Sequence, residues 1–367
     1  MKLKLLTFLP AIFLFISCSH TQQQTEDAII DVSAELVVPN HYIATKATNN
    51  IVIDGQANET DWQSAEFSAP FIDIEGVEIP TYETKMKMLW DDDYLYVYAQ
   101  LQEPHIWGDI KQRDAVIFYN NDFEVFIDPS GNGRNYGEIE INALGTIWDL
   151  HLDKPYRTLG WANNHWDLNN LKSAVNLQGT LNNANDEDSL WSVEMAIPLT
   201  AILELKGARN AVLKEGDQWR INFSRVEWIH EIIDGRYQRK KENGKFLPEN
   251  NWVWSPQKVI NMHEPEKWGT VQFTNETSAA NTVFIEDEDL QTKQIAYALF
   301  RQIRFRKVGK QLVQEVGQTQ YIKAIYAENK SAEATYYKTN MGFEVKIIDP
   351  QTTHVFIINE DGLLVEK

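Results

Sequence analysis

The chain contains 367 residues with a formal net charge of −19, and 43% of its residues are hydrophobic. Such an acidic protein is not suited to binding nucleic acid, because nucleic-acid recognition rewards basic surfaces. The length fits one large domain together with a small one. Cys18 is the only cysteine, so no intrachain disulfide holds the fold, which must depend on its hydrophobic core.

The first eighteen residues predict a targeting segment. Lys2 and Lys4 supply positive charge, and the apolar run over residues 5–16 is too short to span a bilayer. Cys18 ends the run and resembles the lipobox cysteine of bacterial lipoproteins, which is acylated and becomes the first mature residue. We therefore expect residues 1–18 to be a lipoprotein signal peptide with lipidation at Cys18. A secretory peptide that is cleaved elsewhere is the alternative.

Residues 19–44 begin as a polar, aperiodic stretch and are expected to form a tether. The lipid anchor and this tether place the protein in the bacterial cell envelope, at the outer membrane. The residues after Cys18, SHTQQQ, lack the early acidic cluster associated with surface export in the lipoproteins that the segment resembles. This difference favours the periplasmic face over the outer surface.

Short β-strands follow one another over residues 45–274. Alternating apolar residues, frequent turn residues and few helical segments predict a mostly β fold, an antiparallel β-sandwich of immunoglobulin-like type. The segment KMKMLWDDDYLYVYAQLQE, for example, predicts a hairpin that turns at three consecutive aspartates. All twelve tryptophans lie within this region, from Trp62 to Trp268.

Two of the expected strands carry an unusual number of acids. In residues 121–142, NDFEVFIDPSGNGRNYGEIEIN, apolar positions alternate with polar ones that include Glu124, Glu138 and Glu140. A solvated sheet face explains the pattern, and the spacing alone favours that explanation. The alternative is a shared polar site, because like charges on neighbouring strands destabilise a sheet unless something compensates them.

The end of the chain predicts a second, smaller unit. Residues 274–282 are polar and are expected to be a linker, and residues 283–367 are expected to form an α+β unit of unknown role. Apolar residues from Ile295 to Val316 recur at helical spacing, and the segments GFEVKIIDP and THVFIINEDG alternate as a hairpin.

Three motifs in one order resemble family 9 carbohydrate-binding modules, which are DOMON-like sandwiches. They are IDGQANETDWQSA, WDDDYLYVYAQLQEP and NDFEVFIDPSGN, and the resemblance extends over residues 45–274. It implies a saccharide ligand, because sugar hydroxyls need polar partners and pyranose C–H faces need flat apolar ones. It also implies glycan capture or carbohydrate catabolism, with other envelope proteins of a glycan-uptake system as partners.

The resemblance assigns roles to polar residues. Glu124 matches the glutamate of the family's central strand, and Asn142 matches an asparagine on the next strand. Glu140 stands where the best-known form carries arginine, so an acceptor replaces a donor. Arg225 has the parity of apolar neighbours in INFSRVEW and therefore needs a β-bulge or a buried carboxylate partner, for which Glu124 or Glu140 is expected.

Aromatic clamps are expected at two places. One lies near Phe118 or Tyr119, and the other lies near Trp252 and Trp254, although Met262 aligns with that second position. For any single tryptophan, packing in the core is the alternative. The predicted carbohydrate-binding set is Tyr119, Glu124, Glu140, Asn142, Asn222, Arg225, Trp228, Trp252 and Trp254.

Two other functions remain open at this point. Glu124 and Glu140 would serve as the paired carboxylates of a glycoside hydrolase, although the resemblance implies binding without catalysis. Met262 and His263 offer the ligand types of a haem-binding, DOMON-type electron-transfer protein, but neighbours in one loop rarely reach opposite faces of a haem.

One loop has the oxygen-rich spacing of a calcium site. Asp128, Ser130 and Asn132 alternate in DPSGNGRN, but the distant glutamate of an EF-hand is not present. A plain hairpin loop is the favoured interpretation, with structural calcium as the alternative, and no other cofactor is expected.

Overall fold

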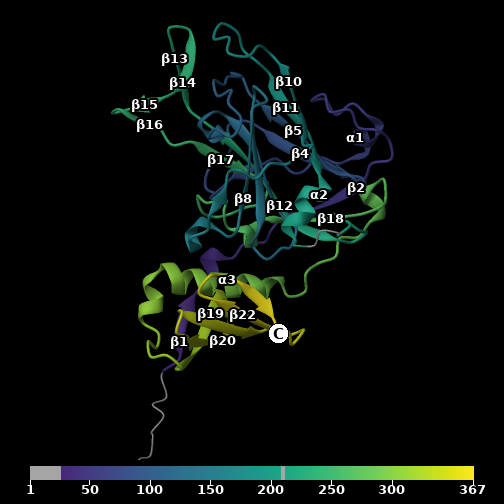
Figure 1. Ribbon diagram of the computed structural model, residues 1–367. Helices are drawn as coiled ribbons and strands as arrows, with labels where there is room; N and C mark the ends of the chain where they lie inside the picture. The colour runs from purple at the N-terminus through teal and green to yellow at the C-terminus, as the bar shows by residue number, and fades with distance from the viewer. Residues whose placement is uncertain (1–25, 208–210) are drawn as a thin grey trace, which may run out of the picture.

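The computed structural model describes residues 26–207 and 211–367, and it contains a large β-sandwich and a smaller α+β unit (Figure 1). The predicted mostly β fold is therefore confirmed. Within the described residues, no helix is both long and apolar enough to cross a membrane. The predicted signal peptide and Cys18 lie outside the described residues.

One layer of the sandwich contains the aspartate-turn hairpin predicted from the sequence. Its strands are antiparallel except for the last pair, which is parallel. In spatial order they are β10 (Lys172–Gln178), β11 (Leu190–Pro198), β5 (Tyr94–Gln102), β4 (Thr84–Trp90) and β2 (His41–Lys46).

The second layer continues from the first, because β2 also pairs in parallel with β18. Its strands are β18 (Gly269–Phe273), β12 (Gln218–Glu227), β6 (Asp122–Asp128), β7 (Tyr136–Asn142), β8 (Ile147–Leu152) and β9 (Ala162–Asn163), with β17 (Asn250–Val253) and β3 (Ile72–Asp73) on the free edge of β12. The hydrophobic core lies between the two layers. It joins side chains such as Val97 and Met195 from the first to Val125 and Phe223 from the second.

Short elements surround the sandwich. Two hairpins project from one end of it (Figure 1). They are β13 (His230–Ile233) with β14 (Arg236–Arg239), and β15 (Lys241–Glu242) with β16 (Lys245–Phe246). The short helices are α1 (Thr60–Ser64) and α2 (Leu199–Leu205), together with the 3₁₀ turns η1 (Ser33–Glu35), η2 (Ile117–Tyr119), η3 (Tyr156–Thr158), η4 (Pro265–Lys267) and η5 (Ala279–Asn281).

The smaller unit is a sheet covered by one helix. Helix α3 (Leu290–Phe305) packs on the sheet with its own hydrophobic core. The helical spacing predicted a helix that reaches Val316, but α3 ends at Phe305 and is followed by the turn η6 (Lys307–Lys310). The strands, in spatial order, are β1 (Ala28–Asp31), β19 (Thr319–Ala327), β20 (Lys330–Lys338), β21 (Phe343–Ile348), β22 (Val355–Asn359) and β23 (Leu364–Glu366).

The expected tether is wrong for its described part. Residues 28–31 form β1, which pairs in parallel with β19 at the edge of the smaller sheet, and Ile30 is buried in that unit's core. Residues 41–44 belong to β2 of the sandwich. Their apolar side chains gain burial and their backbone gains ladder partners, so this segment is part of both folded units.

Buried ion pairs join the two units. The carboxylate of Glu266 in η4 forms an ion pair with Arg157 of the sandwich, at 2.7 Å, and another with Arg301 of α3, at 2.6 Å. Arg301 also pairs with Glu35 at 2.6 Å. We call this set, completed by the pair between Glu264 and Lys267 at 2.7 Å, the interface network. Its three acids are matched by three basic side chains.

Candidate functional site

Strands β6 and β7 sort their side chains by parity. The odd-numbered residues of β6, such as Phe123 and Val125, enter the core between the layers. The even-numbered residues point to the opposite side, where Glu124 lies directly across from Glu140 on β7 and from Ser224 on β12. The acids noticed in the sequence therefore share one side of the sheet.

That side of the sheet carries a cavity of about 300 Å³, which we call the acidic cavity. Its floor is formed by Glu124, Glu138 and Glu140, all buried. Its remaining lining comes from several loops and strands: Ile74, Phe118, Trp148, Leu150, Tyr156, Val226, Glu249, Asn251, Ile260, Asn261, Met262 and His263. This lining combines carboxylates and amides with aromatic and aliphatic surface.

The acids at the floor have no basic partner. One carboxylate oxygen from each of Asp122, Glu124 and Glu140 lies within 4.8 Å of the others, and the three side chains are at most 6% exposed. Within the described ranges, no lysine or arginine forms an ion pair with these three or with Glu138. Phe118 N–H donates to Glu140 at 3.0 Å.

Burial and mutual repulsion raise the pKa values of this cluster. Burial raises the pKa of Glu124 to about 7, although the nearby Ser224 hydroxyl opposes the rise. Burial, followed by the charge of Glu124, raises the pKa values of Asp122 and Glu138 well above their ordinary range. Burial and the three neighbouring acids do the same for Glu140. Strong perturbation of this kind is typical of functional sites.

Aromatic side chains form the walls of the cavity. Phe118 comes from η2, Trp148 from β8 and Tyr156 from η3. The Tyr156 ring packs edge-on against His263 at 4.6 Å between centroids. The Tyr136 hydroxyl lies 3.0 Å from Nδ1 of His263, and burial lowers the pKa of His263 to about 4, so this histidine is neutral at pH 7.

Of the predicted polar residues, the structure brings Glu124 and Glu140 into the cavity but not the two asparagines. Asn142 is buried, and its side chain fixes the turn after β7 by accepting from the backbone N–H of Leu144 and Thr146. Asn222 exchanges hydrogen bonds with the backbone of Ser255. The amides of both asparagines are used by the protein itself, so their assignment to ligand binding is wrong.

Arg225 is buried against a carboxylate, as its parity predicted, but the expected partners are wrong. Its guanidinium pairs with Glu103 at 2.9 Å and with Glu227 at 2.8 Å on the core side of β12. Glu124 and Glu140 point to the other side of the sheet. Arg225 therefore pairs with two structural acids, and its charge is not available to the acidic cavity.

The predicted tryptophan clamps are also wrong. Trp252 and Trp254 are only 3% exposed and lie in the sandwich core. Trp228 is buried behind η2 and donates its indole N–H to the Phe118 carbonyl. Tyr119 is exposed but lies outside the cavity lining, under the Arg239 guanidinium. Phe118, the other residue proposed at that position, lines the cavity, as does Met262.

In the expected calcium loop, the side-chain oxygens of Asp128 and Asn132 accept hydrogen bonds from the loop's own backbone. The carboxylate of Asp128 accepts from the backbone N–H of Ser130, Gly131 and Gly133, and the side chain of Asn132 accepts from the N–H of Arg134. These bonds account for the shape of a plain hairpin loop, and a calcium ion at this loop stays a prediction.

Sequence reasoning missed several residues of the cavity. Trp148 and Tyr156 come from the strand and the turn that follow β7, and Glu249 and Asn251 come from a segment more than ninety residues after Tyr156. Asp122 was overlooked, although its even number places it on the same side as Glu124. The parity rule would have found Asp122, whereas no local signal marks the loop residues.

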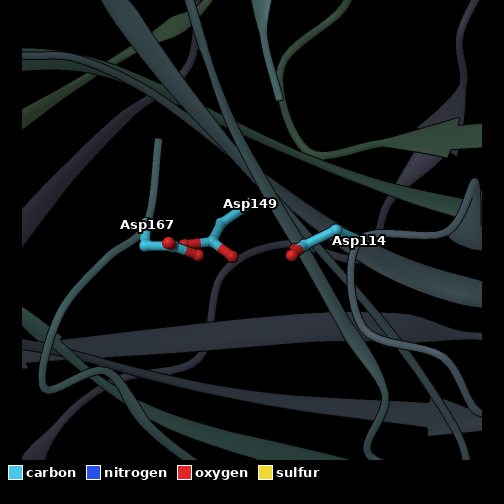
Figure 2. Close-up of side chains that lie close together, drawn as sticks. All are labelled: Asp114, Asp149 and Asp167. Atoms are coloured by element: carbon cyan, nitrogen blue, oxygen red, sulfur yellow. The ribbon is translucent and has the colours of Figure 1, made fainter. Parts of the chain in front are cut away.

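A second group of acids lies near the end of β8. Figure 2 shows Asp149 between Asp114 and Asp167. Here Arg113 supplies the positive charge, because it pairs with Asp149 and lies 3.5 Å from Asp167 and 3.6 Å from Asp114. This group has a basic partner, in contrast to the acids of the acidic cavity.

The fold and the cavity define a β-sandwich with a polar cavity on one side of its sheet. Residues 53–216 match the family described as carbohydrate family 9 binding domain-like. This part of the chain is therefore a domain of that family.

Individual relatives are distant. The exoglucanase XynX of Acetivibrio thermocellus is 28% identical over 166 residues, and the match spans 45% of this chain but only 13% of that protein. A family 9 carbohydrate-binding module of Caldicellulosiruptor kristjanssonii in complex with cellotriose is 15% identical, over 68% of this chain and all of that one, with a TM-score of 0.43. A putative carbohydrate-binding protein of Bacteroides uniformis is 16% identical over 64% of this chain and all of that one, with a TM-score of 0.47.

Proposed function

We propose that this protein captures a saccharide in the acidic cavity. The observation that carries the proposal is the lining, in which buried carboxylates form the floor and aromatic rings form the walls. Hydroxyl groups donate to the carboxylates, and the C–H face of a sugar ring packs on an aromatic side chain such as Trp148. The family matched by residues 53–216 agrees with this chemistry.

The charge of the floor limits the class of saccharide. Within the described residues the lining contains three glutamates at the floor, Glu249 at the edge, and no lysine or arginine. In the cation-free cavity, a uronic acid or a sulfated sugar would bring a further negative charge to these acids and would be repelled. We therefore expect a neutral or amino-bearing saccharide as ligand.

Binding fits the geometry better than glycoside hydrolysis does. The two carboxylates of a glycosidase flank the bond that they cleave. Glu124 and Glu140 instead stand side by side on neighbouring strands, within 4.8 Å of each other. The absence of reducing-sugar release from any oligosaccharide that binds would agree with this expectation, and turnover would contradict it.

Haem binding has no comparable support. Met262 and His263 line the same cavity from one loop, and adjacent residues are poorly placed to ligate opposite faces of a haem. A purified protein without Soret absorption is expected.

A glycan array followed by calorimetric titration with the best-bound oligosaccharide tests the proposal. Trp148→Ala should weaken binding roughly threefold to tenfold, because stacking on an aromatic ring contributes about 0.5–1.5 kcal/mol. Trp161→Ala is the matched control, since Trp161 is 63% exposed and lies outside the cavity. Equal affinity of both variants and the parent protein would contradict the assignment of the cavity.

We further propose that the protein is lipid-anchored in the cell envelope through Cys18, which would bring the cavity to glycans near the outer membrane for uptake or catabolism. The support is the leader sequence alone, with its charged start, its short apolar run and its cysteine. Cys18→Ala should release the protein from the membrane fraction or leave it unprocessed. Normal processing with unchanged membrane partition would contradict the anchor.

A further inference from the structure

The acids Asp122, Glu124 and Glu140 converge without compensation. Their closest oxygens lie within 4.8 Å of one another, and all three side chains are buried. Three carboxylates that share a buried site cannot all ionise unless a proton or a cation offsets their repulsion. At the other three acid groups described above, arginine supplies a positive charge, and no described lysine or arginine pairs with these three acids.

Polar atoms around the cluster lack hydrogen-bond partners, and they come from three strands. Both carboxylate oxygens of Asp122 on β6 are unpartnered among the described residues, as are Oγ of Ser224 on β12 and Oε2 of Glu138 on β7. The backbone N–H of Val226 opposes the rise in the pKa of Asp122 without completing a hydrogen bond to its carboxylate.

Ser224 is not one of the acids, and it lies beside Glu124, whose pKa its hydroxyl lowers. It is fully buried, and it lies directly across from Glu124 on the same side of the sheet. Glu138 lines the cavity beside Glu124 and Glu140. Since buried polar atoms are nearly always satisfied in folded proteins, unpartnered oxygens around one point indicate a ligand that accepts oxygen lone pairs.

We propose that Asp122, Glu124 and Glu140 bind a divalent metal ion, with Ser224 as a further oxygen donor. The donor set contains only oxygen, which suits hard cations and not the softer metals that prefer nitrogen or sulfur. Calcium fits best, because it accepts irregular geometry with ligands at about 2.3–2.6 Å, so that two of its ligands lie up to about 5 Å apart. This site is distinct from the loop of Asp128.

The ion would lie at the floor of the acidic cavity. Glu124 and Glu140 line the cavity, whereas Asp122 is fully buried and does not line it. Coordination positions of the ion that face the cavity would be free for two neighbouring hydroxyls of a sugar. This last step rests on the proposed saccharide binding, but the binding of the metal ion itself does not.

Calcium titration of chelator-treated, dialysed protein tests the site without any saccharide. Isothermal titration should show one saturable event, and calcium should raise the melting temperature more than magnesium does. Asp122→Asn should weaken calcium binding by at least about tenfold, since even the loss of a residue that only supports a ligand costs that much. Asp167→Asn, in the Arg113 group, should bind calcium as the parent does.

Several outcomes would overturn the proposal: no saturable binding in the parent protein, equal binding in Asp122→Asn, or loss of binding in Asp167→Asn alone. Asp122→Asn removes an uncompensated buried charge, so it should fold and melt no lower than the calcium-free parent, which keeps the comparison valid. The role in saccharide capture is tested separately by repeating the saccharide titration with and without calcium. Equal saccharide affinity with and without calcium would refute that role. Calcium binding in a protein that binds no saccharide would refute only the proposed function.

Discussion

Two of the regions in which this molecule buries carboxylates, the interface network and the acidic cavity, compensate them in different ways. In the interface network, Glu35, Glu264 and Glu266 are matched by Arg157, Lys267 and Arg301. In the acidic cavity, four acids share one side of the sheet, and no described basic residue pairs with them. In the interface network the chain supplies cations for acids whose burial serves the fold. We infer that the acids left without them serve a ligand.

The pKa values of two glutamates express this difference. Both Glu266 and Glu124 are buried, and burial raises the pKa of a carboxyl group. For Glu266, burial is outweighed by Arg157 and Arg301, which lower its pKa to about 2. For Glu124, no arginine opposes burial, and its pKa rises to about 7. Neighbouring charge, rather than depth alone, therefore separates the pKa values of these two acids.

The largest expected effect is on the interface network. Arg301→Met should lower the free energy of unfolding by about 3–5 kcal/mol, because it leaves Glu266 and Glu35 buried with one partner fewer. Chemical denaturation measures the change. Arg304→Ala, on the exposed side of the same helix, is the control and should change stability little. An Arg301→Met variant as stable as the parent would show that the two units do not depend on this network.

The next effect is a dependence of stability on pH. The folded pKa of Glu266 lies below its ordinary value of 4.5, so its stabilisation is present in full above about pH 4.5 and is lost as the pH falls toward 2. Glu266→Gln should reduce this acid-induced loss when both proteins are unfolded with denaturant at pH 5 and at pH 3. Parallel losses in the two proteins would remove Glu266 as a source of acid sensitivity.

A smaller effect of opposite sign is expected in the cavity. Glu138→Gln removes one of the uncompensated acids and keeps the shape of the side chain, so the free energy of unfolding of the calcium-free protein should stay equal or rise, by up to about 1 kcal/mol. The comparison with Glu266→Gln at pH 7 is the sharpest one, since that variant should be less stable than the parent. A Glu138→Gln variant destabilised as much as Glu266→Gln would erase the distinction between the two regions.

Strand parity in the sequence predicted part of the fold and part of the candidate site. The alternation around Glu124 and Glu140 predicted paired strands with acids on one side, and the parity of Arg225 predicted a buried carboxylate partner. These are local consequences of the period-two geometry of a strand. Parity places Trp252 and Trp254 on the same side of the chain at β17, but it does not say whether that side faces the core or the ligand.

Long-range pairing was beyond the sequence pattern. The parallel pairing of β1 with β19 joins residues nearly three hundred positions apart, and no local property of residues 28–31 specifies a partner. The cavity walls have the same origin, since Tyr156 and Met262 meet only because distant turns are carried to one side of the sheet. Both depend on tertiary packing, which the spacing of residues does not encode.

Glu124→Gln tests the central claim most directly. If Glu124 belongs to the ligand site, the variant should lose affinity and keep its stability. If Glu124 is a structural acid like Glu266, the variant should lose stability and keep its affinity. We expect the first result for this variant. Its affinity for the array-selected saccharide should fall about tenfold to a hundredfold, since a charged hydrogen bond is worth roughly 1.5–3 kcal/mol. In calcium-free protein, its melting temperature should stay the same or rise, because Arg225 pairs with Glu103 and Glu227 and not with Glu124. A variant that binds the saccharide as the parent does and, without calcium, melts several degrees lower than the parent would contradict the account and make these acids part of the scaffold.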